Sequence, residues 1–175
     1  VPSMEAMADA VVKSLITEGY EKCRVVGHSM GGYVALALAE RFPEFVEGLC
    51  LLHSHPFADS SEKKANRYRE IELVNKGHKE LIARTAIPRL FAEGFAEKNP
   101  AAVEQSLAIA LRTKALGIEY ALKAMAVRSD RTEVLRKLAG DAWIIAGVND
   151  QLIDYKILES LAEKHPTVQY HCLKH

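Results

Sequence analysis

The stretch Val25–Gly32 reads VVGHSMGG and joins a short apolar run to the Ala/Leu-rich segment Tyr33–Ala39. β-Branched residues before a Gly-X-Ser-X-Gly turn, and good helix formers after it, are typical of a strand, a sharp turn and a helix. Ser29 stands at the apex of that turn. The stretch therefore predicts a nucleophile elbow, in which a serine hydroxyl is presented at the end of a strand.

The residues around Ser29 suit this role. Gly27 and Gly31 lack side chains, which would allow the strand end to approach the first helical turn closely. A valine in place of Gly31 is therefore expected to disturb both folding and activity. The backbone N–H of Met30 follows the nucleophile at the positive end of the helix, so we expect it to donate to an oxyanion.

From these residues outward, the sequence resembles the α/β-hydrolase superfamily. The run Gly27–Glu44, GHSMGGYVALALAERFPE, is close to the elbow of many small serine hydrolases in that superfamily. The resemblance implies an α/β fold: a parallel, doubly wound sheet, here the C-terminal half of the hydrolase core, with a helical cap insertion. It also implies earlier strands and a His-Gly oxyanion loop before the elbow. We therefore expect the chain to be a fragment of a longer hydrolase and to be inactive by itself.

The order of segments along the chain agrees with this fold class. Four segments have the composition of buried strands, and they are Lys22–Val26, Gly48–Ser54, Asp141–Gly147 and Val168–Leu173. Capping boxes, glycines and prolines punctuate a helical region between the second and third of these strands. We predict a partial core from residues 1–56 and 139–175, with a helical lid at residues 57–138. The charge-rich part of the lid, residues 62–72, is expected to be a solvated face.

Composition narrows the classes of partner. The 175 residues include 23 basic and 23 acidic side chains, so neither nucleic acid nor an anionic membrane is expected as a partner. The three cysteines fall in or beside apolar runs and do not suggest a disulfide framework. No apolar run is long enough for a transmembrane helix and no signal peptide is recognisable, so we expect a cytoplasmic protein acting on a small molecule. Metal-ligand spacings are missing from the sequence, and no cofactor is expected. The sequence does not indicate the oligomeric state.

An elbow serine needs a histidine to take its proton and a carboxylate to orient that histidine. The superfamily places its acid in a Gly-X-X-Asp segment after a strand, and the resemblance assigns that role to Asp150. A capping function for the following helix is the alternative for Asp150, although Asp154 could also fill it. Asp59 is a weaker candidate for the acid, because its place in a capping box already accounts for it. It is kept as a reserve.

The sequence does not identify the base. The other histidines in strands, helices or element ends are expected to be structural or solvent-facing: His28, His53, His78, His165 and His171. The superfamily carries its histidine after the last strand, usually as Gly-His. His175 lies near that position but lacks the glycine, so the base is either His175 or a residue beyond the chain end.

Two functions from different classes follow. The first is a serine hydrolase that cleaves a small carboxylic ester, amide or thioester through an acyl-enzyme on Ser29. The second is a non-catalytic ligand-binding or scaffold protein with the same fold, because a fold does not fix a function. The predicted elbow serine and acid favour the hydrolase.

Overall fold

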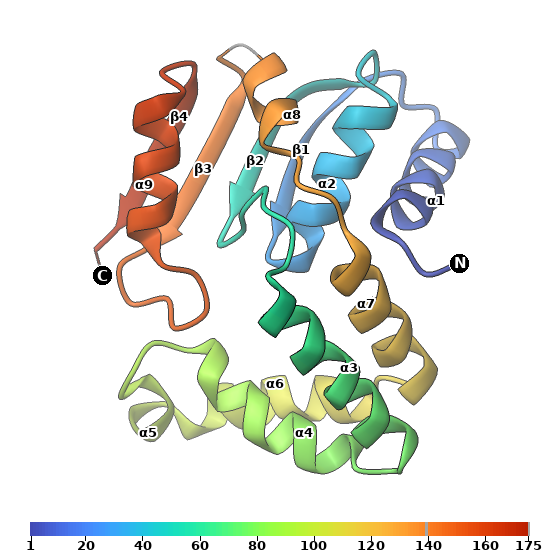
Figure 1. Cartoon of the computed structure of the whole chain (residues 1–175), viewed down its shortest axis with the longest axis vertical. Coiled ribbons are helices and arrows are strands. Elements are labelled where there is room, and N and C mark those ends of the chain that lie inside the picture. Colours follow the sequence, from blue (N-terminus) through green and yellow to red (C-terminus); the bar gives the residue numbers. More distant parts are fainter. Residues whose placement is uncertain (139, 175) are drawn as a thin grey trace.

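A computed structural model of the chain describes residues 1–138 and 140–174. Its centre is a parallel sheet in the order β1-β2-β3-β4 (Figure 1). The strands are β1 (Cys23–His28), β2 (Val46–Leu52), β3 (Ala142–Gly147) and β4 (Val168–Leu173). The predicted parallel α/β fold is confirmed, although β1 and β2 differ by up to two residues at each end from the predicted strands. Because all strands are parallel, their carboxyl ends meet at one edge, where loop side chains gather.

Helices cover one face of this sheet in the part of the chain that the structure describes. They are α1 (Met4–Thr17), α2 (Met30–Arg41), α8 (Thr132–Lys137) and α9 (Tyr155–Lys164); Figure 1 shows α2, α8 and α9 in front of the strands and α1 beside α2. Alternate strand residues point to this covered face, where Leu51 and Ile144 are fully buried. On the opposite face Val26 and Trp143 are exposed. The expectation of strands buried on both faces is therefore not met by the described residues.

The first two helices are joined to the chain after the insertion by a buried arginine. Ser3 caps α1, as predicted, because its hydroxyl accepts the N–H of Ala6 at 3.1 Å. Arg131 is 3% exposed and pairs with Glu5 of α1 and with Glu40 of α2. Its guanidinium therefore holds both helices against the segment that leads into α8.

The chain between β2 and β3 forms a helical insertion. It contains α3 (Ser61–Asn75), α4 (Lys79–Ala86), the 3-10 helix η1 (Ile87–Leu90), α5 (Phe95–Lys98), α6 (Pro100–Arg112) and α7 (Ala115–Val127). These helices stand beyond the carboxyl edge of the sheet, below it in Figure 1. By contrast, α8 packs beside α2 and contributes Leu135 to the main core. None of the described helices is long and apolar enough to cross a membrane.

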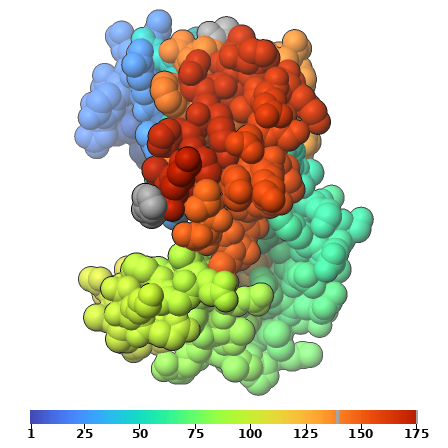
Figure 2. Space-filling model, turned by 90° about the vertical axis from the view of Figure 1, so that its left-hand side faces the viewer, coloured from blue at the N-terminus to red at the C-terminus, as the bar shows by residue number. Residues whose placement is uncertain are grey.

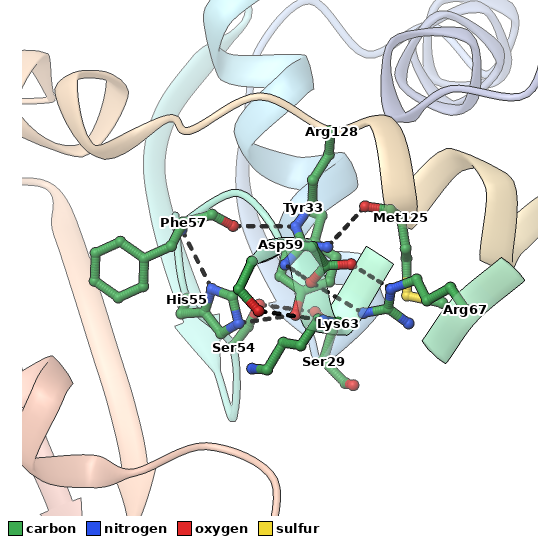
Figure 3. Close-up of polar contacts among 11 residues, drawn as sticks. Ser29, Tyr33, Ser54, His55, Phe57, Asp59, Lys63, Arg67, Met125 and Arg128 are labelled. Atoms are coloured by element: carbon green, nitrogen blue, oxygen red, sulfur yellow. Dashed lines mark hydrogen bonds and ion pairs between the residues drawn. The ribbon is translucent and has the colours of Figure 1, made fainter. Parts of the chain in front are cut away.

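A buried ion cluster joins the insertion to the core (Figure 3). Asp59, whose side chain is fully buried, pairs with Arg67 of α3 and with Arg128, which follows α7. Arg128 also donates to the carbonyls of Phe57 and Met125 at 3.1 and 2.8 Å. Its guanidinium lies over the ring of Tyr33 in α2, 3.9 Å from the centroid. Both ends of the insertion thus meet at the elbow helix.

The role predicted for Asp59 is corrected by this cluster. The residue that caps α3 is Ser60, whose hydroxyl accepts the N–H of Lys63 at 3.2 Å. Burial raises the pKa of Asp59, but hydrogen bonds from Arg67 and Arg128 outweigh it and hold the pKa below its ordinary value. Asp59 is therefore an ionised structural carboxylate, and it does not line the pocket at the elbow.

Replacement of Arg128 by methionine tests the importance of the cluster. The change leaves Asp59 with a single partner and removes the side-chain donor to the part-buried carbonyls of Phe57 and Met125, so we expect a loss of about 3 kcal/mol in unfolding free energy. Arg41→Met is the control, because the Arg41–Asp9 pair is about half exposed and is worth at most about 1 kcal/mol. Urea denaturation of both variants measures the difference. Equal losses would show that the cluster adds nothing beyond a surface pair.

Candidate active site

Ser29 lies between the end of β1 and the start of α2 in a strained backbone conformation. Its φ of 51° and ψ of −120° are unusual for a residue with a side chain, and such strain is typical of a nucleophile elbow. The N–H of Ser29 donates to the carbonyl of Leu52 at 3.0 Å. The hydroxyl of Ser54 donates to the carbonyl of Ser29 at 2.7 Å. Both contacts with the β2 end hold the turn in its strained form.

The close approach at the elbow is made by Gly27 and Gly32. A Cβ on Gly27 would lie 2.5 Å from the Cα of Gly32, and a Cβ on Gly32 would lie 2.2 Å from the hydroxyl oxygen of Ser54. A Cβ on Gly31 would meet nothing within 4 Å. The prediction that Gly31 lets the elbow close is therefore wrong, because the helix turns its second glycine, Gly32, toward β2.

Met30 is the first residue of α2, so its N–H has no acceptor within the helix. This placement agrees with the predicted oxyanion donor, which stays a prediction. In a hydrolase of this kind, removal of one such donor costs about 10²–10³ in rate.

Asp150 follows β3 and its carboxylate is fixed at both oxygens. Oδ1 accepts the N–H groups of Leu152 and Ile153 at 2.8 and 3.0 Å. Oδ2 lies 3.2 Å from Nδ1 of His53. Asp150 does not cap α9, because Asp154 does so through the N–H of Lys156. The capping alternative for Asp150 is thereby removed.

The contact with Asp150 changes the interpretation of His53. This residue follows β2 directly and has a positive φ of 45°, which is rare for a histidine. It was expected to be structural or solvent-facing, and the structure places its side chain, which is 33% exposed, in the lining of the pocket of Ser29 and Asp150. Its position in the sequence, at the last apolar residues of a strand, gave no signal of this pairing. The expectation for His175 concerns a residue outside the described part of the chain.

Ser29, His53 and Asp150 open into a pocket of about 390 Å³ between the carboxyl edge of the sheet and the insertion. Figure 2 shows a waist in this region, where the yellow-green insertion meets the orange and red C-terminal part. Most of the other lining residues are apolar, and they are Leu90, Phe91, Ala92, Gly147, Val148, Leu152, Ile153 and Leu173; His28 and Asn149 complete the wall. The insertion therefore contributes one wall, and the sheet edge contributes Ser29, His53 and Asp150.

A second histidine lies behind the elbow in the polar cluster of Figure 3. His55 is 7% exposed; its Nδ1 accepts the N–H of Phe57 and its Nε2 lies 3.2 Å from the hydroxyl of Tyr33. Burial, together with the charges of Arg128 and Lys63, lowers the pKa of His55 from 6.5 to about 4. His55 is therefore a neutral structural histidine near pH 7, and it does not line the pocket of Ser29.

The parallel sheet and the strained strand-to-helix turn at Ser29 are those of an α/β hydrolase. The chain belongs to the family described as serine aminopeptidase, S33, whose model matches residues 3–175. RutD of Yersinia enterocolitica, named as a candidate carbamate hydrolase, is 26% identical over 162 residues, which are 91% of this chain and 58% of that protein.

Solved structures show the same fold. A thermophilic esterase from Thermogutta terrifontis is 32% identical, with a TM-score of 0.91 over 99% of this chain and 64% of that one. The enol-lactonase from Burkholderia xenovorans is 20% identical, with a TM-score of 0.85 over 98% of this chain and 65% of that one. Across these three relatives, this chain spans between 58% and 65% of the relative's length.

The two elbow glycines after Ser29 provide a matched test of the turn. Gly32→Ala places a Cβ inside Ser54, so we expect a loss of about 1–3 kcal/mol in unfolding free energy. Gly31→Ala should be neutral or stabilise by up to about 1 kcal/mol, because the site is open and alanine favours the helix. Chemical denaturation compares the two variants. A larger loss for Gly31→Ala would contradict the geometry described above.

His55 predicts a specific pH dependence of stability. Its folded pKa of about 4 lies below the ordinary value of 6.5, so the unfolded chain binds a proton more readily. Stability is therefore complete above pH 6.5 and falls as the pH drops toward 4, by about 2 kcal/mol between pH 7 and pH 5. Urea denaturation at both pH values measures this slope. His55→Gln should reduce the slope, and an unchanged slope would assign it to other groups.

Proposed function

We propose that this chain carries the catalytic elbow of a serine hydrolase for small carboxylic esters, amides or thioesters. The observation that carries the proposal is the strained backbone of Ser29, which stands at the mouth of a pocket shared with the carboxylate of Asp150. An idle serine in a surface turn would have no need of a φ of 51°. This conformation is the one that presents a nucleophile to a bound substrate.

The proposed chemistry is acyl transfer in two stages. The hydroxyl oxygen of Ser29 attacks the substrate carbonyl while a histidine takes its proton, and the N–H of Met30 donates to the oxyanion. Collapse of the tetrahedral intermediate expels the alcohol, amine or thiol, which receives the proton from the histidine. Water then attacks the acyl-enzyme while the histidine takes its proton. The histidine returns that proton to the oxygen of Ser29 as the carboxylic acid leaves. Asp150 orients the histidine and stabilises its charged form.

The pocket suggests the kind of substrate. Its walls carry several apolar side chains, among them Leu90 and Phe91 from the insertion and Leu173 from the sheet. Apart from the part-buried pair His53 and Asp150, the only other titratable lining residue among those described is His28. A short, uncharged acyl or alkyl group suits these walls better than a charged one. The esterase, enol-lactonase and carbamate hydrolase named above share a carbonyl electrophile, which supports the same reaction class.

The insertion is proposed to act as the lid of this pocket. Its segment at Leu90–Ala92 forms one wall, and the side-chain amide of Gln151 donates to the carbonyl of Phe91. Gln151 follows Asp150 directly, so the insertion is fastened to the loop that carries the acid.

Ester hydrolysis with a serine control tests the proposal. The protein is assayed with p-nitrophenyl acetate and butyrate, both as residues 1–175 and together with its flanking coding sequence. Ser29→Ala should remove turnover by several orders of magnitude in whichever form is active, because it removes the nucleophile. Ser14→Ala, on the exposed part of α1, should retain it. Turnover that survives Ser29→Ala would refute Ser29 as the nucleophile, and tight ligand binding without any turnover would favour a non-catalytic binding protein.

A further inference from the structure

A second hollow adjoins the pocket of Ser29 at the loop that carries Asp150. It has a volume of about 190 Å³, and its other walls come from the chain around the start of α3 and from the first turn of α9. Leu152 and Ile153 line both hollows. The side chains of these two residues therefore form the partition between the pocket of Ser29 and the second hollow.

The inner wall of the second hollow is apolar. Leu158 is fully buried, and Phe57 and Ala58 are partly buried. The ring of Phe57 stacks on the imidazole of His55, with the centroids 5.4 Å apart, and Figure 3 shows it turned away from the ion cluster. Both ring nitrogens of His55 are already engaged, Nδ1 by the N–H of Phe57 and Nε2 by the hydroxyl of Tyr33. A ligand in the hollow therefore meets aromatic and aliphatic carbon at this wall.

The polar residues Ser60, Lys63 and Asp154 lie at the rim of the second hollow, and all three are exposed. The hydroxyl of Ser60 accepts the N–H of Lys63. The carboxylate of Asp154 accepts the N–H of Lys156. Because Lys63 and Asp154 carry opposite charges, the rim favours neither an anion nor a cation. An uncharged apolar group is therefore the occupant that suits this hollow.

The partition between the two hollows is anchored to the loop of the acid. The N–H groups of Leu152 and Ile153 both donate to Oδ1 of Asp150, at 2.8 and 3.0 Å. Ile153 also packs against the hydrophobic core. A substrate whose carbonyl lies at Ser29 consequently has a fixed pair of apolar side chains in the same pocket, and the second hollow borders on them.

We propose that the second hollow is an acyl-chain subsite, which binds the distal carbons of a substrate whose carbonyl lies at Ser29. The inference rests on the function proposed above and narrows its substrate class to compounds with uncharged acyl chains longer than butyryl, such as octanoyl esters. The pocket of Ser29 holds the carbonyl and the first carbons of the chain. The chain then passes Leu152 and Ile153, and its remaining methylenes are buried against Phe57 and Ala58.

Binding of uncharged methyl ketones tests the subsite without any turnover. Pentan-2-one and nonan-2-one both carry a carbonyl and differ only in the length of the alkyl chain. Each methylene that nonan-2-one buries in the hollow should strengthen its binding about fourfold. We therefore expect nonan-2-one to bind at least about tenfold more tightly than pentan-2-one. Isothermal titration calorimetry of the chain, together with its flanking coding sequence, measures both affinities.

Two pairs of variants locate this preference. Ala58→Leu fills the hollow and should remove the advantage of nonan-2-one, whereas the affinity for pentan-2-one stays unchanged. Ala65→Leu is the matched control, because Ala65 is exposed on α3 and lines neither hollow. Ile157→Asp serves if Ala58→Leu fails to fold, since it places a carboxylate in the wall of the hollow at a side chain that is 55% exposed. Its control is Ile16→Asp, at a side chain on α1 that is 59% exposed.

Turnover of p-nitrophenyl butyrate and octanoate separates the subsite from the proposed function. A preference for the octanoate in kcat/KM that disappears in Ala58→Leu or Ile157→Asp would support both. A ketone preference that these variants abolish, without any ester turnover, would support the subsite and count against the proposed function. Equal binding of the two ketones, or a preference for nonan-2-one that survives both variants, would overturn the subsite. Butyrate turnover that requires Ser29 would then leave the proposed function standing.

Discussion

The contact between α2 and the end of β2 is the constraint on which the site depends. Gly32 lies so close to Ser54 that no side chain fits there, and Gly27 lies equally close to Gly32. The helix can therefore begin directly at the strand end, and the only residue left to make the turn is Ser29, at φ 51°. The hydrogen bond from Ser54 to the carbonyl of Ser29 then keeps the strained turn from relaxing. Packing of the smallest residues thus fixes the position of Ser29.

A different kind of interaction fixes the insertion. Asp59 and Arg128 are buried, with Arg67 partly buried beside them, although burial of charges is costly and apolar residues of the same size would often be as stable. Ion pairs and hydrogen bonds are satisfied in one relative arrangement of the helices, whereas apolar side chains can pack in many. The cluster contacts Tyr33 of the elbow helix, so the insertion is aligned with the same helix that positions Ser29.

Local features of the site could be predicted from the sequence, and contacts between distant segments could not. The Gly-X-Ser-X-Gly turn, the cap at Ser3 and the four strands depend on neighbouring residues, and these patterns are read along the chain. The pairing of His53 with Asp150 joins residues 97 positions apart, and that of Arg128 with Asp59 depends on the path of the insertion. Gly31 and Gly32 differ only in the direction each faces on the helix. Such differences follow from packing, which the sequence pattern does not resolve.

The sheet and the insertion supply different parts of the site. Side chains able to do chemistry follow parallel strands, where ladder hydrogen bonds hold each strand end level with its neighbour. The apolar wall at Leu90 and Phe91 comes from a short 3-10 helix and its following loop, which the amide of Gln151 fastens to the acid loop. Loops of this kind change more readily than strands do. Selection for another substrate can therefore alter the wall while the strand ends keep Ser29, His53 and Asp150 in place.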